Sequence, residues 1–137
     1  MVTILDRLDV LRQHLDHLRE IRPRVMDAES LRGDLSLRNN VSHSLLIVCQ
    51  VVIDVAKELS TRRELLFEDY TEAVQNLATF PEFPSPMVQD LDWLPGLRNK
   101  LIYEGGSLDL ARVVEALDRL EPVEGFAERV RQIEAAS

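Results

Sequence analysis

Apolar residues recur every three or four positions along most of the chain, which is the period of an amphipathic α-helix. In the first such segment the apolar stripe consists of Ile4, Leu8, Leu11, Leu15 and Leu18. Thr3, followed by Asp6 three residues later, has the pattern of a capping box, so a first helix is expected from there to about Pro23. No segment alternates β-branched and polar residues between turns, so no strand is expected.

The second helix is expected at about 36–59 and is the most apolar part of the chain. Its stripe consists of Leu37, Val41, Leu45, Val48, Val52, Val55 and Leu59. From Leu45 to Ala56 apolar residues occupy almost every side, which predicts a central helix that other helices surround. Gln50 and Asp54 are the exceptions, and they lie one turn apart.

The rest of the pattern completes a helical bundle. It predicts a short helix after Asp69, one at about 86–104, one at about 109–120 and one from about Pro122 onward. Pro95 and Gly96 should kink or split the helix at 86–104, and Gly105 with Gly106 should end it. Four longer helices with one or two short ones favour an all-α, up-and-down bundle that forms a single domain over 1–137.

The charge and the cysteine content narrow the possible functions. The formal net charge is −8, which argues against a general nucleic-acid binder because phosphate affinity comes mostly from Lys and Arg. A locally basic site for RNA remains compatible with this charge. Cys49 is the single cysteine, so no disulfide can form within the chain.

The start lacks the regions of a signal peptide, and the longest apolar stretch is too short to span a bilayer, so a cytoplasmic protein is expected.

The segment from Arg98 to Gly106 holds the most informative side chains. Arg98 falls on or beside the apolar stripe of its helix, and a guanidinium is rarely buried without a partner. Asn99 and Tyr103 are four residues apart and share a face near the end of that helix. The spacing leaves two interpretations open: Arg98 pairs with Asp54 and sets the helix registry, or it belongs to a functional site.

A resemblance to the HepT-like branch of the HEPN superfamily rests on two segments, Leu97–Glu104 and Cys49–Ala56. It extends over about residues 3–133. The resemblance implies a helical bundle that forms a homodimer, with the two copies of the motif facing each other in a cleft. It also implies a metal-independent ribonuclease toxin that needs no cofactor and is neutralised by a minimal nucleotidyltransferase.

The family motif is arginine, a polar residue, three further residues, histidine, one residue and tyrosine. By this resemblance Arg98 is the arginine that stabilises charge on the phosphate, and Asn99 is its polar neighbour. Tyr103 stands at the position of the histidine, which is the general base. Gly105 stands at that of the tyrosine that accepts a nucleotide, and it has no hydroxyl. A phenol has a reference pKa of about 10 against about 6.5 for an imidazole, so tyrosine is the poorer base near pH 7.

The candidate site residues are therefore Arg98, Asn99 and Tyr103, without a metal ligand among them. Two functions follow from the departures in the motif. One is a weak ribonuclease of a toxin–antitoxin pair, acting on RNA as a homodimer. The other is a non-catalytic dimeric module that binds a minimal nucleotidyltransferase. A third interpretation is a helical scaffold in which Arg98 is purely structural.

Four other residues have plainer explanations. His14 and His17 lie on the polar side of the first helix, where a solvated face is expected rather than a metal site. His43 on the central helix is expected to pack or to form a hydrogen bond, and it would serve as a base only if it faced the Arg98 cleft. Trp93 is expected in the core or at the dimer surface rather than as an RNA-stacking platform.

Overall fold

The chain is helical along nearly its whole length. In the computed structural model, residues 1–105 and 107–137 are described in full. The α-helices are α1 (Ile4–Ile21), α2 (Ala28–Arg32), α3 (Leu35–Arg62), α4 (Tyr70–Gln75), α5 (Ser85–Gln89), α6 (Leu94–Tyr103), α7 (Leu110–Leu117) and α8 (Glu121–Ala136). Single 3-10 turns lie at Arg22–Arg24, Asn76–Thr79 and Gly105–Ser107. The predicted all-α class is confirmed, and these residues contain no strand.

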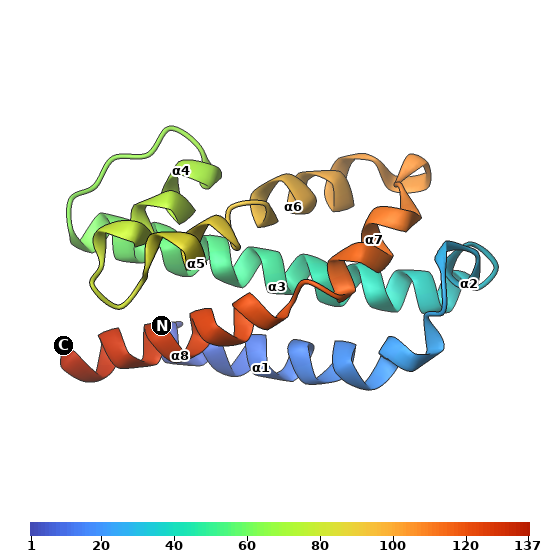
Figure 1. Ribbon diagram of the computed structural model, residues 1–137, viewed down its shortest axis with the longest axis horizontal. Helices are drawn as coiled ribbons and strands as arrows, with labels where there is room; N and C mark the ends of the chain where they lie inside the picture. Colours follow the sequence, from blue (N-terminus) through green and yellow to red (C-terminus); the bar gives the residue numbers. More distant parts are fainter.

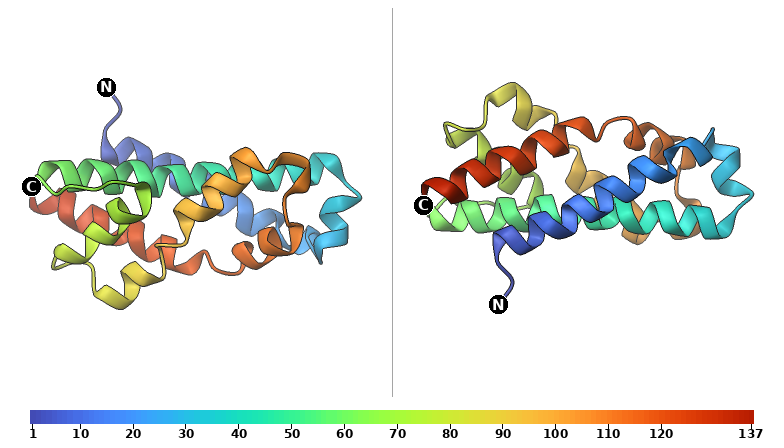
Figure 2. Two further views of the ribbon diagram at one scale, coloured as in Figure 1. Left: turned by 90° about the horizontal axis from the view of Figure 1, so that it is seen from above. Right: turned by 90° about the horizontal axis from the view of Figure 1, so that it is seen from below.

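Helix α3 is the axis of the bundle, and its strongest contacts are with α1 and α6 (Figure 1). Helix α1 runs along one side of α3, and α6 lies along the opposite side. Helix α8 lies beside α1, so that the two chain termini are at the same end of the molecule (Figure 2). Helices α2 and α7 meet at the other end. On α3, His43 is exposed and Leu46, Ile47 and Gln50 are only partly buried, so one side of this helix is not fully covered.

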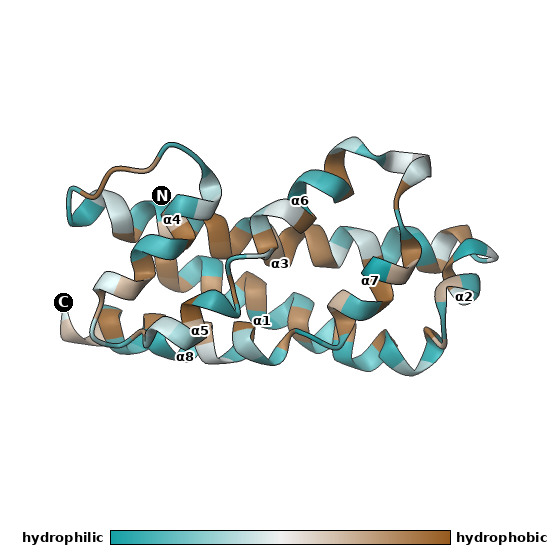
Figure 3. Cartoon of the chain, turned by 45° about the horizontal axis from the view of Figure 1, so that its top comes forward, coloured by the Kyte–Doolittle hydropathy of each residue, from teal (hydrophilic) through white to brown (hydrophobic). Residues whose placement is uncertain are grey.

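The core follows the predicted stripes. Every stripe residue named above on α1 and α3 is buried, and so are Leu91, Leu94, Leu97, Val113, Val123, Phe126 and Val130. In Figure 3 hydrophobic residues are concentrated along the middle of α3, whereas polar residues recur along the helices around it. Burial of this apolar surface drives the helices together. Among the fully described residues, no helix is both long and apolar enough to cross a membrane.

Side-chain caps set the starts of most helices. Thr3 and Asp6 form the predicted capping box at the start of α1, with distances of 3.1 Å from Asp6 N to Thr3 Oγ1 and 2.9 Å from Thr3 N to Asp6 Oδ2. Aspartates cap four further helices, α2, α3, α4 and α7: Asp27, Asp34, Asp69 and Asp109. A carboxylate at this position accepts a hydrogen bond from an otherwise unpaired backbone N–H. Its negative charge also interacts favourably with the positive end of the helix dipole.

Two helices differ from the sequence-based prediction. Helix α2 was not predicted, because five residues are too few to show a periodic pattern. The helix expected at about 86–104 is split into α5 and α6, as predicted, but the break is a turn at 90–93 and not at Pro95 and Gly96. Pro95 lies in the first turn of α6, where its missing N–H removes no helical hydrogen bond. The break therefore falls just before Pro95 and not at it.

Helix α6 ends where the glycines predict. Its C-cap is Glu104, and Gly105 follows with a φ of +47°, a left-handed conformation that glycine adopts without steric cost. Gly106, the second glycine of the predicted stop, lies outside the fully described residues. The helix end therefore places Tyr103 in its final turn.

Candidate functional site

Arg98 lies in the second turn of α6 and is half-buried against α3. Its Nε donates to Gln50 Oε1 at 3.2 Å, and its Nη1 donates to Asn99 Oδ1 at 3.0 Å. Both acceptors are neutral amides. The guanidinium is thus held in place across the α3–α6 contact by groups that leave its positive charge uncompensated.

The nearest acidic group in this network is already paired. Asp54 Oδ1 accepts from Gln50 Nε2 at 2.8 Å, and its Oδ2 forms a salt bridge of 3.0 Å with Arg7 Nη1. The pair of Arg98 with Asp54, one interpretation of the spacing, is therefore not what the structure contains. Asp54 instead orients Gln50, and Gln50 orients Arg98. Among the fully described residues, no carboxylate forms a salt bridge with Arg98.

Tyr103 occupies the last turn of α6 and is 76% exposed. In the single chain its side chain faces solvent and not a cleft. Asn99, one turn earlier, is also exposed. The structure therefore places Arg98 and Asn99 in contact. Tyr103 lies one turn after Asn99 on the same helix and forms no hydrogen bond with either residue.

A tyrosine that the sequence reasoning missed lies beside this arginine. The ring centroid of Tyr70, at the start of α4, is 5.4 Å from Arg98 Cζ and 5.1 Å from Lys57 Nζ. Cations at such distances from an aromatic face are attracted to it. Next to the ring is a cavity of about 450 Å³, lined by Glu68, Asp69, Tyr70, Thr71, Pro95 and Asn99. Nothing in the local pattern around Tyr70 pointed to this position, because α4 and α6 meet only in the folded chain.

The three histidines gather between α1 and α3. His14 Nδ1 lies 3.0 Å from the hydroxyl of buried Ser44, and the rings of His14 and His43 meet edge to face with centroids 6.0 Å apart. His17 Nε2 lies 2.7 Å from Asn40 Oδ1. The solvated face expected for His14 is only partly solvated, because His14 also faces the contact with α3. His43 packs against the ring of His14 but is otherwise exposed. Among the residues described in full, no cluster of three or more acidic, histidine or cysteine side chains is arranged to hold a metal ion.

The position of His14 makes stability depend on pH. Burial lowers the pKa of its imidazole below the usual 6.5, and the nearby His43 and His17 lower it further. The folded state then binds protons less readily than the unfolded state, so stability is complete above pH 6.5 and falls as the pH drops toward the lowered value. We expect a lower urea midpoint at pH 5.5 than at pH 7.5. In a His14→Gln variant the decrease should be smaller, and an equal decrease would contradict this assignment.

Trp93, Cys49 and Arg62 have structural roles. Trp93 packs against the core, donates from Nε1 to the Asp90 carbonyl at 2.8 Å and carries Arg119 over its ring. Burial raises the pKa of the Cys49 thiol to about 12, so it stays protonated and unreactive. Arg62 forms salt bridges with Glu58 and Glu134. These contacts assign Trp93, Cys49 and Arg62 to the fold rather than to a binding site.

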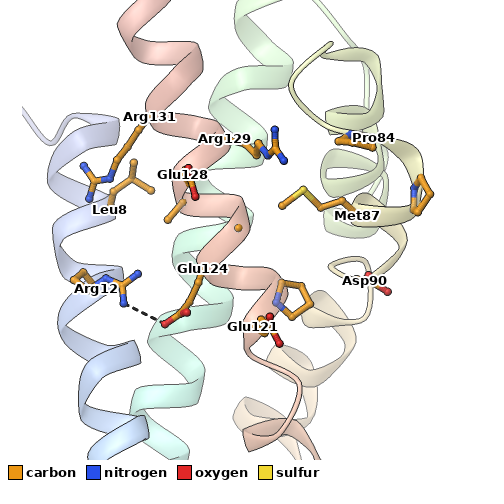
Figure 4. Close-up of a pocket in the computed structure, with 14 residues that line it drawn as sticks. Leu8, Arg12, Pro84, Met87, Asp90, Glu121, Glu124, Glu128, Arg129 and Arg131 are labelled. Carbon is orange, nitrogen blue, oxygen red and sulfur yellow. Dashed lines mark hydrogen bonds and ion pairs between the residues drawn. The ribbon is translucent and has the colours of Figure 1, made fainter.

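A larger groove lies on another side of the molecule, between α8, α1 and α5 (Figure 4). Its volume is about 970 Å³, and its lining carries charges of both signs. Arg12 Nη1 and Glu124 Oε1 form an ion pair across it at 3.2 Å. Met87 reaches over Gly125 so closely that a Cβ there would lie 2.6 Å from its methyl carbon. The groove therefore holds one ion pair beside a tight helix contact, and the motif residues lie elsewhere.

The sequence of this chain matches a known protein family. The family model described as "Ribonuclease HepT-like" matches residues 11–130. The chain belongs to this HepT-like family. Comparison with curated protein sequences gave no match.

Solved structures share the HepT-like fold. A tri-AMPylated HEPN toxin of Shewanella oneidensis, in complex with an MNT antitoxin, is 20% identical over 94% of this chain and 96% of its own, with a TM-score of 0.80. A toxin–antitoxin structure with AMP-PNP is 21% identical over 94% of this chain and 97% of its own, with a TM-score of 0.81. At these identities the likeness establishes the bundle and its connections. The chemistry of the HepT-like site must therefore be derived from the residues of this chain.

Proposed function

We propose that this protein is the HepT-like subunit of a toxin–antitoxin pair, a homodimer that binds RNA at Arg98 and has a minimal nucleotidyltransferase as its protein partner. One observation carries the RNA site: Arg98 is fixed by two neutral amides, while the nearby carboxylate of Asp54 is neutralised by Arg7. A positioned guanidinium without its own counter-ion is suited to a phosphate. The MNT antitoxin in the complex of the Shewanella oneidensis toxin supports the proposed partner.

The proposed reaction is metal-independent cleavage of RNA. The 2′-oxygen of a ribose attacks the adjacent phosphorus, the bond to the 5′-oxygen breaks, that oxygen takes up a proton from water, and a 2′,3′-cyclic phosphate remains. Arg98 would stabilise the charge that develops on the phosphate, with Asn99 holding one side of the guanidinium. Tyr103, at the position of the general base, would take the proton of the 2′-hydroxyl. Only the phenolate form of a tyrosine can accept this proton, and that form is scarce near pH 7, so we expect slow cleavage.

The open side of α3 supports the homodimer. His43, Leu46, Ile47 and Gln50 follow one another on this side at helical spacing, and none of them is fully buried. On α6, Ile102 is 40% exposed next to Tyr103. A second copy placed over this surface would cover these apolar side chains and bring two Arg98 residues toward each other.

A second candidate function is a non-catalytic module that dimerises and binds the nucleotidyltransferase. Tyr103 and Gly105 favour it, because the family's base and its modified tyrosine are both replaced at these two positions. This function needs the fold and the dimer but no proton transfer. It predicts a stable complex with a nucleotidyltransferase encoded beside this chain, and failure of the two to co-purify would count heavily against it.

Substitution of Arg98 tests the RNA site. We expect the Arg98→Ala variant to bind a short single-stranded RNA at least tenfold more weakly than the natural chain, because charge-assisted hydrogen bonds to phosphate are lost. Fluorescence anisotropy in a chelator measures the affinity, and gel analysis of the same samples measures cleavage. Arg131→Ala removes an exposed arginine from α8 and should leave the RNA affinity nearly unchanged. Equal affinities for Arg98→Ala and the natural chain would rule out the proposed RNA site.

A further inference from the structure

The cavity beside Arg98 is lined by ring side chains and by polar side chains. Tyr70 from α4 and Pro95 from α6 supply the rings, and Thr71 and Asn99 add a hydroxyl and an amide. Arg98 Cζ lies 5.4 Å from the Tyr70 ring centroid, and Arg98 Nη1 donates to Asn99, so two residues that line the cavity also adjoin the arginine. A ligand that contacts both Arg98 and the cavity would therefore need an anionic group next to a flat ring.

The charges in the cavity exclude a phosphate from its interior. Glu68 and Asp69 bring two carboxylates to its lining, and Asp69 Oδ1 already caps α4 by accepting from Glu72 N at 2.8 Å. Carboxylates repel an anion and accept hydrogen bonds from amino groups. The Asn99 oxygen accepts from Arg98, which leaves the amide nitrogen of Asn99 as a donor. The lining thus offers acceptors from the start of α4 and a donor from α6.

We propose that this cavity binds a nucleobase with an exocyclic amino group, cytosine in preference to uracil, from the strand whose phosphate Arg98 binds. This inference rests on the RNA site proposed above. Cytosine presents its amino group to a carboxylate and its carbonyl oxygen to the Asn99 amide. Uracil has a carbonyl oxygen at the position of the amino group and would face Glu68 or Asp69 as a second acceptor. Tyr70 provides the ring on which the base stacks.

The cations around the ring fit a nucleotide better than an isolated base. Lys57 on α3 lies 5.1 Å from the same centroid as Arg98. A strand that inserts one base beside Tyr70 would therefore pass its backbone near two positive charges, in a protein whose net charge is −8. The positive charges of Arg98 and Lys57 would bind the phosphate. The negative charges inside the cavity would bind the amino group of the base.

The test uses two probes that differ only in the base. Fluorescein-labelled hexamers of 2′-O-methylcytidine and 2′-O-methyluridine lack a free 2′-hydroxyl and cannot be cleaved, so anisotropy measures binding alone. We expect the natural protein to bind the cytidine hexamer about tenfold more tightly than the uridine hexamer, because one hydrogen bond to a charged acceptor is gained and a repulsion avoided.

Two variants isolate the lining. The double variant Glu68→Gln, Asp69→Asn removes both charges but keeps the cap of α4, because asparagine caps as well as aspartate. We expect its two affinities to agree within about twofold. Its matched control, Asp90→Asn with Glu128→Gln, removes two carboxylates from the other groove and should keep the tenfold preference. Tyr70→Leu should weaken binding of both hexamers about tenfold, and Tyr70→Phe should bind like the natural protein.

The outcomes separate this inference from the proposed RNA site. If both hexamers bind equally well and Arg98→Ala weakens both, the phosphate site stands and the base pocket is overturned. A cytidine preference that survives in the Glu68→Gln, Asp69→Asn variant would also overturn it. If neither hexamer binds, or if Arg98→Ala changes nothing, the proposed RNA site itself fails.

Discussion

The Tyr103→His variant is expected to cleave RNA about a hundredfold faster than the natural protein, since a positioned general base contributes about 10²–10⁴-fold. Histidine would restore the base of the family motif at a position whose side chain is exposed and free to change. An imidazole has a reference pKa of about 6.5 and is largely available as a base at pH 7, whereas a phenol is almost entirely protonated. The measurement is the initial rate of cleavage of a labelled RNA in the presence of a chelator.

Two control variants accompany this measurement. Tyr103→Phe removes the hydroxyl and should lower the rate of the natural protein if Tyr103 acts as the base. Tyr103→His with Arg98→Ala should lose the gain, because the phosphate is no longer held. If Tyr103→His binds RNA but cleaves it no faster than the natural protein, position 103 does not reach the reacting hydroxyl, and the non-catalytic module becomes the function that the site supports.

The Leu45→Ala variant is expected to lose about 3 kcal/mol of unfolding free energy. Leu45 lies in the middle of α3 with 0% of its side chain exposed, where helices pack around it on several sides. The substitution removes apolar contacts and leaves a cavity that the surrounding helices fill only in part. Chemical denaturation measures the change, and a decrease of about 10 °C in the melting temperature should accompany it.

Leu66→Ala is the matched control for this prediction. It makes the same chemical change at a residue that is 93% exposed, in the segment between α3 and α4. Its effect should stay within about 0.5 kcal/mol, because the side chain buries little surface in the folded state. A small effect of Leu45→Ala, comparable to that of Leu66→Ala, would contradict the central position of α3 in the core.

Much of the fold follows from local signals in the sequence. The stripes of α1 and α3 could be predicted because a helix that packs on one side must repeat its apolar residues with the helical period. The capping box at Thr3 and the stop after Tyr103 are equally local, since each depends on a few neighbouring residues. Helix α2 escaped prediction because its five residues are shorter than two turns. The motif around Arg98 could be named for the same reason, because it lies within one helix.

Only the tertiary structure decided what surrounds Arg98. Whether Asp54 would pair with Arg98 or with Arg7 could not be derived from spacing, because the three residues lie on three different helices. The direction in which α6 crosses α3 brought Gln50 to the arginine and left its charge uncompensated. The cavity at Tyr70 arises in the same way, from the meeting of α4 with α6. Periodicity states which side of a helix is buried, but the partner on that side is set by the packing of the whole chain, and it is that packing which determines the chemistry of this site.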